Sequence, residues 1–290
     1  MKEKRKMTAL LLALTLLACT APTAFAEGSA PIAENLELRT YRNVSVGGRL
    51  TAFDPEDDVV NYTITTEPVK GSVELDESGC FVYTPKENKR GRDYFGYKAV
   101  DSEGNLSQEA TVIIRIEKQK SAVCYSDLKG EACAYAATAL SEYGVFTGER
   151  IGTSLCFCPR QSVTRGEFLS MCMALTGHAP MQAVASSGYA DDALTPAWAR
   201  AYAVTARRTG LAPEGESLRA EEAISAEEAA EVLSRALKLT DVRYLPAEEE
   251  TSQASRNLRA YGIPVSLGSK VLTRAEAAEM LAAALDFLEK

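Results

Sequence analysis

Thr164-Arg165-Gly166-Glu167, Ser225-Ala226-Glu227-Glu228 and Thr273-Arg274-Ala275-Glu276 are three related tetrapeptides that decide the fold of the second half of the chain. In each, the first hydroxyl can accept a backbone N–H, and the Glu three places on can reach back to the first residue's own N–H. This reciprocal arrangement is a capping box. Apolar residues then recur at intervals of three and four, which predicts one buried stripe per helix. Each tetrapeptide therefore predicts the start of an amphipathic helix.

Two of these helix starts carry an arginine, Arg165 and Arg274. A cation is mildly disfavoured at the positive end of a helix dipole, so helix propensity alone does not select arginine there. Free backbone N–H groups beside a guanidinium would suit a carboxylate or a phosphate. From the residues alone, a ligand-binding arginine and a solvated arginine remain open. For the Ser225 tetrapeptide, which has Ala226 at this place, capping alone is favoured.

The ends of the 290-residue chain differ, and its net charge is −8. Residues 1–26 read as an export signal, because four basic residues precede an apolar run that is too short for a membrane span and Ala24-Phe25-Ala26 follows. Alternatively, Leu16-Leu17-Ala18-Cys19 would make the protein a lipoprotein through Cys19. We expect no transmembrane span after removal of the signal. The acidic balance argues against nucleic acid as a partner.

Residues 30–117 carry short β-branched and aromatic runs separated by turn residues, which predicts an all-β sandwich. The alternating runs are residues 61–65, 79–85, 94–100 and 110–116. With Asp54-Pro55-Glu56-Asp57, Lys70-Gly71-Ser72-Val73, Phe81-Val82-Tyr83-Thr84-Pro85, Gly91-Arg92-Asp93-Tyr94-Phe95-Gly96-Tyr97 and Val100-Asp101-Ser102-Glu103-Gly104, the region resembles cadherin-like and bacterial Ig-like modules of exported proteins.

Relatives of this kind often bind calcium between modules through acidic loops. The resemblance makes Asp54, Asp57 and Asp101 weak calcium candidates, because carboxylates are the hard oxygen ligands that calcium prefers. The chain has one such module, so solvated turn carboxylates are the favoured interpretation. We expect no other cofactor.

After a polar linker at residues 118–123, a helical unit is traced three times, at residues 124–178, 188–239 and 240–290. Each unit has a first amphipathic helix that ends at a glycine followed by an apolar residue, then a loop and the capped second helix. The pairs Gly144-Val145, Gly210-Leu211 and Gly262-Ile263 are typical of helix C-terminal caps. Repeating αα units bury their stripes against one another, so this half is predicted to be all-α.

The helical half resembles the S-layer homology (SLH) family. The first unit carries Tyr125-Ser126-Asp127-Leu128, Tyr143-Gly144-Val145-Phe146-Thr147-Gly148, Phe157-Cys158-Pro159 and Val163-Thr164-Arg165-Gly166-Glu167-Phe168. The second keeps Tyr189-Ala190-Asp191, Pro196-Ala197-Trp198-Ala199 and Gly210-Leu211, but has Ala226 where the family has arginine. The third is degenerate: it lacks the opening aromatic-x-Asp and retains Leu272-Thr273-Arg274-Ala275-Glu276.

This resemblance implies a three-pronged helical domain whose grooves hold anionic secondary cell-wall polymer, a glycan linked to peptidoglycan. The polymer-binding candidates are Arg165, Arg274, Thr164, Glu167, Thr273, Glu276 and Trp198. Trp198 suits stacking on a sugar and packing in the core equally well. We expect Tyr125 and Tyr189 to pack, and Asp127 and Asp191 to cap the first helices.

We therefore expect an exported, non-catalytic protein on the bacterial cell wall or S-layer surface. As an alternative, the divergent repeats dock another surface protein. Catalysis is disfavoured, because the sequence has no nucleophile-elbow or phosphate-loop motif and its only histidine is His178. Cys133 and Cys172 are a weak choice for a disulfide. A zinc site formed by Cys156, Cys158 and His178 is disfavoured by its spacing.

Overall fold

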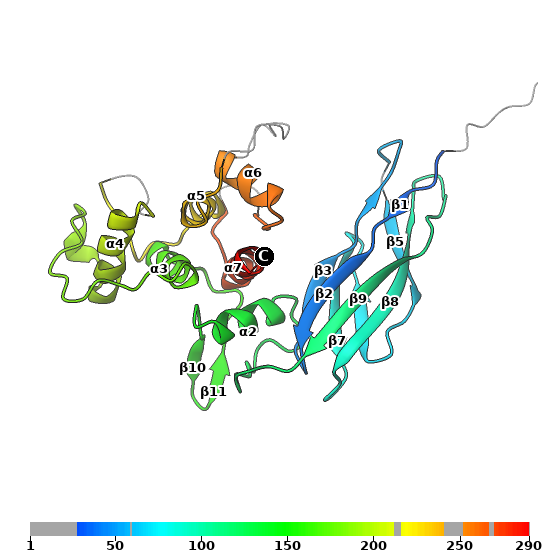
Figure 1. The fold of residues 1–290 in the computed structure, drawn as a ribbon, viewed down its shortest axis with the longest axis horizontal. Helices are drawn as coiled ribbons and strands as arrows, with labels where there is room; N and C mark the ends of the chain where they lie inside the picture. The colour runs from blue at the N-terminus through cyan, green and yellow to red at the C-terminus, as the bar shows by residue number, and fades with distance from the viewer. Residues whose placement is uncertain (1–27, 59, 212–215, 241–251, 267–269, 290) are drawn as a thin grey trace, which may run out of the picture.

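The computed structural model describes residues 28–58, 60–211, 216–240, 252–266 and 270–289 (Figure 1). The predicted export signal at residues 1–26, Cys19 and most of the opening of the third unit lie outside the described residues. Within the described ranges, no helix combines the length and apolar character needed to cross a bilayer.

The N-terminal region is a sandwich of two β-sheets in which most neighbouring strands run antiparallel. Its strands are β1 (Ile32–Ala33), β2 (Leu36–Tyr41), β3 (Val46–Arg49), β4 (Ala52–Phe53), β5 (Asn61–Thr66), β6 (Gly71–Leu75), β7 (Cys80–Pro85), β8 (Gly91–Val100) and β9 (Ala110–Glu117). One sheet has the order β2-β9-β8-β5 and the other β3-β7-β6, while β1 pairs with β4. Only β2 and β9 run parallel within these sheets. The four strands predicted from alternation are confirmed.

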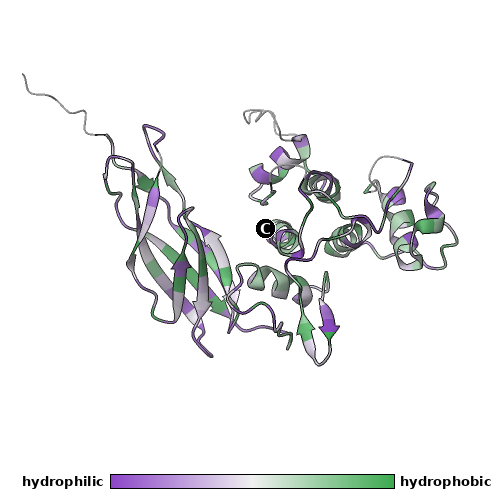
Figure 2. Cartoon of the chain, turned by 180° about the vertical axis from the view of Figure 1, so that it is seen from behind, coloured by the Kyte–Doolittle hydropathy of each residue, from purple (hydrophilic) through white to green (hydrophobic). Residues whose placement is uncertain are grey.

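The sandwich core comes from the inward residues of both sheets, including Phe81, Tyr83, Phe95 and Tyr97, all at most 1% exposed. Figure 2 shows hydrophobic and hydrophilic residues alternating along the strands, as a period of two requires. The Phe81 and Phe95 rings meet edge to face, with centroids 5.2 Å apart. Burying side chains of this size contributes about 1.5–3 kcal/mol each.

The C-terminal region is helical. Its described α-helices are α2 (Ala134–Glu142), α3 (Arg165–Leu175), α4 (Ala197–Thr209), α5 (Ala226–Ala236), α6 (Gln253–Ala260) and α7 (Arg274–Leu288). The 3-10 helix η1 (Asp192–Leu194) precedes α4. The three predicted capping boxes are confirmed at the starts of α3, α5 and α7.

One element departs from the all-α expectation. Strands β10 (Glu149–Ile151) and β11 (Ser154–Cys156) form a hairpin inside the first repeat. Gly152 lies between them with φ +63°, a left-handed conformation that glycine adopts without a Cβ clash. A predicted loop is therefore partly a β-hairpin.

Helices α3, α5 and α7 form the centre of the helical domain (Figure 1). The segments that lead into them close a ring of three hydrogen bonds. The N–H of Ile224 donates to the carbonyl of Val163 (2.9 Å), that of Val163 to Leu272 (3.0 Å), and that of Leu272 to Ile224 (2.9 Å). Equivalent residues of the three repeats thus contact one another in a pseudo-threefold arrangement.

The first helix of each unit packs on the second helix of the preceding unit. Helix α4 packs on α3 and α6 on α5, while α2 closes the ring by packing on α7. The predicted glycine stops are confirmed. Gly210 has φ +76°, and the next N–H, that of Leu211, returns to the carbonyl of Ala206 at 2.8 Å. Because α2 comes from the first unit and α7 from the last, closing the ring of helices needs both ends of the helical region.

Helix α2 also contacts the sandwich. The Tyr41 and Tyr135 rings lie 5.3 Å apart, and the N–H of Gly47 donates to the carbonyl of Ala132 at 2.9 Å. A Cβ on Gly47 would lie 2.6 Å from the Cβ of Ala132, so only glycine permits this approach.

Candidate functional site

The start of α3 has no free backbone donors. The N–H of Arg165 donates to the carbonyl of Glu222 and that of Gly166 to the carbonyl of Ala220, both at 2.9 Å. The third N–H belongs to the capping box. The loop of the second repeat therefore lies across the helix start and occupies the place that an anion was expected to take.

Helix α7 repeats this arrangement. The N–H of Arg274 donates to the carbonyl of Gln161 (2.8 Å) and that of Ala275 to Pro159 (3.0 Å). The expectation of free N–H groups at these two helix starts is wrong, because the loop of a neighbouring repeat satisfies them. Any anion recognition has to come from side chains.

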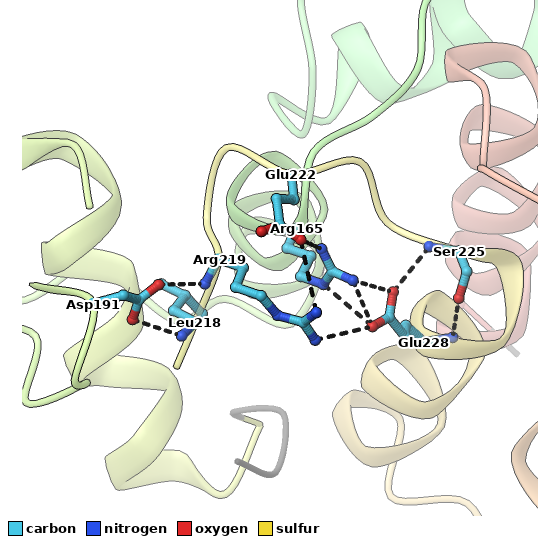
Figure 3. Close-up of polar contacts among 7 residues, drawn as sticks. All are labelled: Arg165, Asp191, Leu218, Arg219, Glu222, Ser225 and Glu228. Atoms are coloured by element: carbon cyan, nitrogen blue, oxygen red, sulfur yellow. Dashed lines mark hydrogen bonds and ion pairs between the residues drawn. The ribbon is translucent and has the colours of Figure 1, made fainter. Parts of the chain in front are cut away.

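The guanidinium of Arg165 spans the junction between α3 and α5 (Figure 3). Its Nη2 lies 2.7 and 3.0 Å from the two carboxylate oxygens of Glu228, and its Nη1 lies 3.1 Å from Glu222. Burial alone would raise the pKa of Glu228, but hydrogen bonds from the Ser225 N–H and from Arg165 lower it overall. Arg165 therefore links α3 to α5 within the domain, and it is also a candidate residue for binding an anion.

Arg219 extends the same cluster toward solvent. Its nitrogens lie 3.7 Å from Glu222 and 3.8 Å from Glu228, and its side chain is 52% exposed. Its φ of +51° places it in the left-handed region. Sequence reasoning missed this residue, because it lies in the loop before the capped helix, outside every repeated phrase.

Asp191 holds that loop. Its two carboxylate oxygens accept the N–H groups of Leu218 (2.9 Å) and Arg219 (2.7 Å; Figure 3). Asp127 does the same for Phe157 and Cys158. Neither side chain caps a first helix, since the N-caps of α2 and α4 are Cys133 and Pro196. The predicted capping role is wrong, and the aspartates instead fix the loops that cross the helix starts.

A groove of about 110 Å³ lies beside the Arg165 cluster. Both apolar and charged side chains line it: Arg165, Leu169, Ser217, Leu218, Arg219, Ile224, Glu228, Glu231 and Val232. This volume suits the edge of an extended chain and is too small to enclose a whole ligand of drug size.

Trp198 is in the first turn of α4 and packs against Gly166 at the start of α3. A Cβ on Gly166 would lie 3.1 Å from the Trp198 ring and 3.1 Å from the carbonyl of Ala220. The indole is 44% exposed and contacts Tyr202 edge to face. The glycine thus allows the indole to lie against the start of α3 while it stays partly exposed.

Arg274 has a different environment. The residue is 3% exposed, lies 5.2 Å from the centre of the Phe146 ring, and pairs with Glu149 and, at 3.7 Å, with Glu167. Its Nε has no partner among the described residues. The gap lined by Phe146, Phe157 and Arg274 has no volume for a water molecule. A ligand would reach this guanidinium only after Phe146 moved.

The other predicted polar residues are used within the helix starts. Thr164 with Glu167, and Thr273 with Glu276, form the two capping boxes. Glu276 also accepts from Lys270 (3.3 Å) and Ser266 (3.1 Å). At the third junction Ala226 is fully buried. Tyr125 and Tyr189 are buried, as predicted.

The calcium candidates lie in turns of the sandwich, and two of them organise those turns through hydrogen bonds. One oxygen of Asp54 accepts the N–H groups of Glu56 and Asp58, both at 3.0 Å, while Asp101 organises a second turn in the same way. Asp57 is exposed, with φ +61°. The described ranges contain no group of three or more His, Cys, Asp or Glu side chains that could hold a metal ion, around these turns or around His178.

The predicted disulfide is wrong. Cys133 and Cys172 are free, buried thiols. Burial raises the pKa of Cys133 to about 12 and raises that of Cys172 as well. Each thiol packs within the core of the helical domain.

Comparisons with known proteins bear on the N-terminal region. Residues 27–118 match the family described as bacterial cadherin-like domain. No SLH match is found for the helical region. No curated protein matches the chain.

Several solved structures share local similarity at low identity. They include the SrpA adhesin from Streptococcus sanguinis (16% identity, 35% of this chain, 62% of that one, TM-score 0.26). Fibronectin(III)-like modules of Clostridium thermocellum CbhA match at 18% identity over 31% of this chain and 47% of theirs, with a TM-score of 0.22. The endo-fucoidan hydrolase MfFcnA4 matches at 17% identity over 33% of this chain and 14% of that one, with a TM-score of 0.26. The chain spans less than two thirds of each, and these scores support no functional argument.

Proposed function

We propose that this chain is an exported, non-catalytic surface protein whose helical domain binds an anionic glycan of the bacterial cell wall and displays the β-sandwich. The cadherin-like match of residues 27–118 supports a surface role. The observation that carries the binding proposal is the groove between α3 and α5, which Arg165 and Arg219 line together with apolar side chains.

The proposed chemistry is an exchange of carboxylates. Glu222 is 60% exposed and makes one hydrogen bond to Arg165, so a ligand carboxylate can replace it at little cost. Glu228 keeps its place because it also accepts the Ser225 N–H at 3.0 Å. Arg219, more than half exposed, would engage the same anion from the solvent side.

Trp198 would add an apolar contact. Its exposed indole lies on α4 beside the start of α3 and offers a face to a sugar ring. Because the junction at Arg274 has no free volume and the third junction has Ala226, we propose one polymer site per chain.

The test is co-sedimentation of the full chain with protein-free cell walls, before and after the secondary polymer is stripped. Arg219→Ala and Trp198→Ala are compared with Arg208→Ala, an exposed position on the same helix as Trp198. Losing a charged hydrogen bond of about 1.5–3 kcal/mol should weaken polymer-dependent binding roughly tenfold or more. The Arg208 variant should bind as the parent does.

Binding that is changed neither by stripping the polymer nor by the Arg219 and Trp198 variants would contradict the proposal. The internal pairing of both motif arginines favours one alternative, in which the repeats dock another surface protein. Failure to bind intact walls, together with capture by a purified surface protein, would support that alternative.

A further inference from the structure

The end of the sandwich next to the helical domain carries a cluster of cations, which we call the basic tip: Lys70, Lys86, Lys89, Arg90 and Arg92. Gly71 pairs with Pro85, and Gly91 pairs with Ile116 near the end of β9. These registers place the loops before β6 and between β7 and β8 at the end from which the chain enters the helical region (Figure 1).

The charge of the basic tip is only partly compensated: Glu37, whose pKa is lowered mainly by its hydrogen bond to Arg115, is also within electrostatic reach of Arg92. None of the five side chains forms an ion pair with a carboxylate in the described part of the chain. Residues 86–92 include a single acid, Glu87, and all seven are exposed. The nearby Asp93 is 2% exposed and points inward, accepting from the N–H of Lys70 and the hydroxyl of Tyr83, both at 2.8 Å.

The whole chain, in contrast, has a net charge of −8. Carboxylates gather at the opposite end of the sandwich, where Gly28 donates to Glu103 and Ser29 donates to Glu56. Cations that lie together repel one another and attract anions to that part of the surface. The field of the tip points to an anionic partner.

The two loops of the tip are held together by their own lysines. Lys70 Nζ donates to the carbonyls of Arg90 (3.2 Å) and Arg92 (2.8 Å), and Lys86 Nζ donates to the carbonyl of Val69 (2.9 Å). An ammonium has three donors, so both lysines retain N–H groups for a ligand. The cations are therefore positioned before any ligand arrives.

We propose that the basic tip binds a linear polyanion, a polymer that carries a carboxylate or phosphate at regular intervals. Lys86, Lys89 and Arg90 lie on the exposed loop between β7 and β8, Arg92 is exposed at the start of β8, and Lys70 is half-buried beside them, so the cations suit many weak contacts along a chain better than one enclosed anion. Val69, 72% exposed between them, adds an apolar contact. This site is on the sandwich and is separate from the Arg219 groove.

The test is fluorescence anisotropy of labelled polygalacturonate titrated with the full chain at several salt concentrations, with neutral dextran as the reference polymer. Lys89→Ser/Arg90→Ser removes two side chains that make no hydrogen bond or ion pair with the described part of the chain. The control, Arg150→Ser/Arg208→Ser, makes the same change in net charge at two exposed positions in the helical domain.

The tip variant should bind roughly tenfold more weakly and lower the salt slope by about two, one for each cation removed. The control and Arg219→Ala should retain tip-dependent binding, which separates this proposal from the function proposed for the groove. Equal losses in the tip variant and the charge-matched control would overturn it.

Two further measurements can also overturn the proposal. Tip-dependent binding to phosphatidylglycerol vesicles without binding to the polymer would indicate a membrane surface. Self-association in sedimentation velocity that the tip variant abolishes, without polymer binding, would indicate the acidic end of a second copy.

Discussion

Arg165 and Glu228 join the starts of α3 and α5, the capped helices of two successive repeats. Nη2 of Arg165 lies 2.7 and 3.0 Å from the two carboxylate oxygens of Glu228. The same Glu228 closes its own capping box by accepting the Ser225 N–H. Arg274 and Glu167 repeat the relationship more loosely, at 3.7 Å. The Arg and Glu of the repeated phrase therefore act across units at two junctions, where Glu228 and Glu167 each serve both their own helix and its neighbour.

Removing the motif arginines should destabilise the helical domain to different extents. Arg274 is 3% exposed, and Arg274→Ala should cost about 3–5 kcal/mol because it leaves a cavity beside the Phe146 ring and removes the donor to the Phe157 carbonyl. Arg165→Ala should cost about 1–3 kcal/mol, since Glu228 remains partly hydrated. Urea unfolding followed by circular dichroism measures both.

Arg219→Ala is the matched control for this ranking. Its ion pairs are long and its side chain is 52% exposed, so the change in unfolding free energy should stay within about 0.5 kcal/mol. Equal changes in unfolding free energy at all three positions would contradict the interpretation that Arg165 and Arg274 hold neighbouring repeats together.

Acid should weaken the junction between α3 and α5. Burial opposes ionisation of Glu228, but the Ser225 N–H and Arg165 lower its pKa below the ordinary 4.5. The unfolded chain therefore takes up the proton at a higher pH than the folded chain. The stability from this group is complete above pH 4.5 and is lost as the pH falls through the folded pKa.

Melting temperatures measured between neutral and acidic pH check this expectation. The parent protein should lose stability on acidification more steeply than Glu228→Gln, which cannot titrate at this position. Parallel curves for the two proteins would show that the junction carboxylate does not contribute to acid sensitivity.

The sequence predicted what depends on local patterns. Three capping boxes, the glycine stop at Gly210 and the alternation of strands such as β9 are short-range features, each determined by a few neighbouring residues. The environment of Arg165 was not predictable, because its partners Glu222 and Glu228 come from the next repeat.

The same reason explains the error at Asp191. An aspartate shortly before a helix favours an N-cap, but this side chain instead accepts two N–H groups about 27 residues along the chain. Arg219 was missed because only this tertiary contact brings its loop to the groove. Long-range hydrogen bonds form the candidate site, and the periodicity of the sequence does not encode them.

The thiols of the helical domain should differ sharply in reactivity. Cys124 is exposed, whereas Cys172 is buried and its pKa is raised by burial, so little thiolate is available. Brief treatment of the native protein with iodoacetamide, followed by peptide mass spectrometry, should label Cys124 and spare Cys172. Equal labelling would contradict the packing described here, provided that urea exposes both sites.

Gly47→Ala should loosen the contact between the sandwich and α2. The new Cβ would lie 2.6 Å from the Cβ of Ala132, and the Gly47 N–H would lose its 2.9 Å bond to the Ala132 carbonyl as the chains separate. Both domains keep their own cores, so each should remain folded. Small-angle scattering should show a larger radius of gyration, and trypsin should cut the linker near Lys118 and Lys120 faster. Ser45→Ala, which removes the 3.2 Å bonds of the Ser45 hydroxyl to the Gly130 N–H and to the Thr84 hydroxyl without adding bulk, should have a smaller effect. An unchanged radius for Gly47→Ala would mean that the loop at Ala132 yields and that the docking does not depend on this glycine.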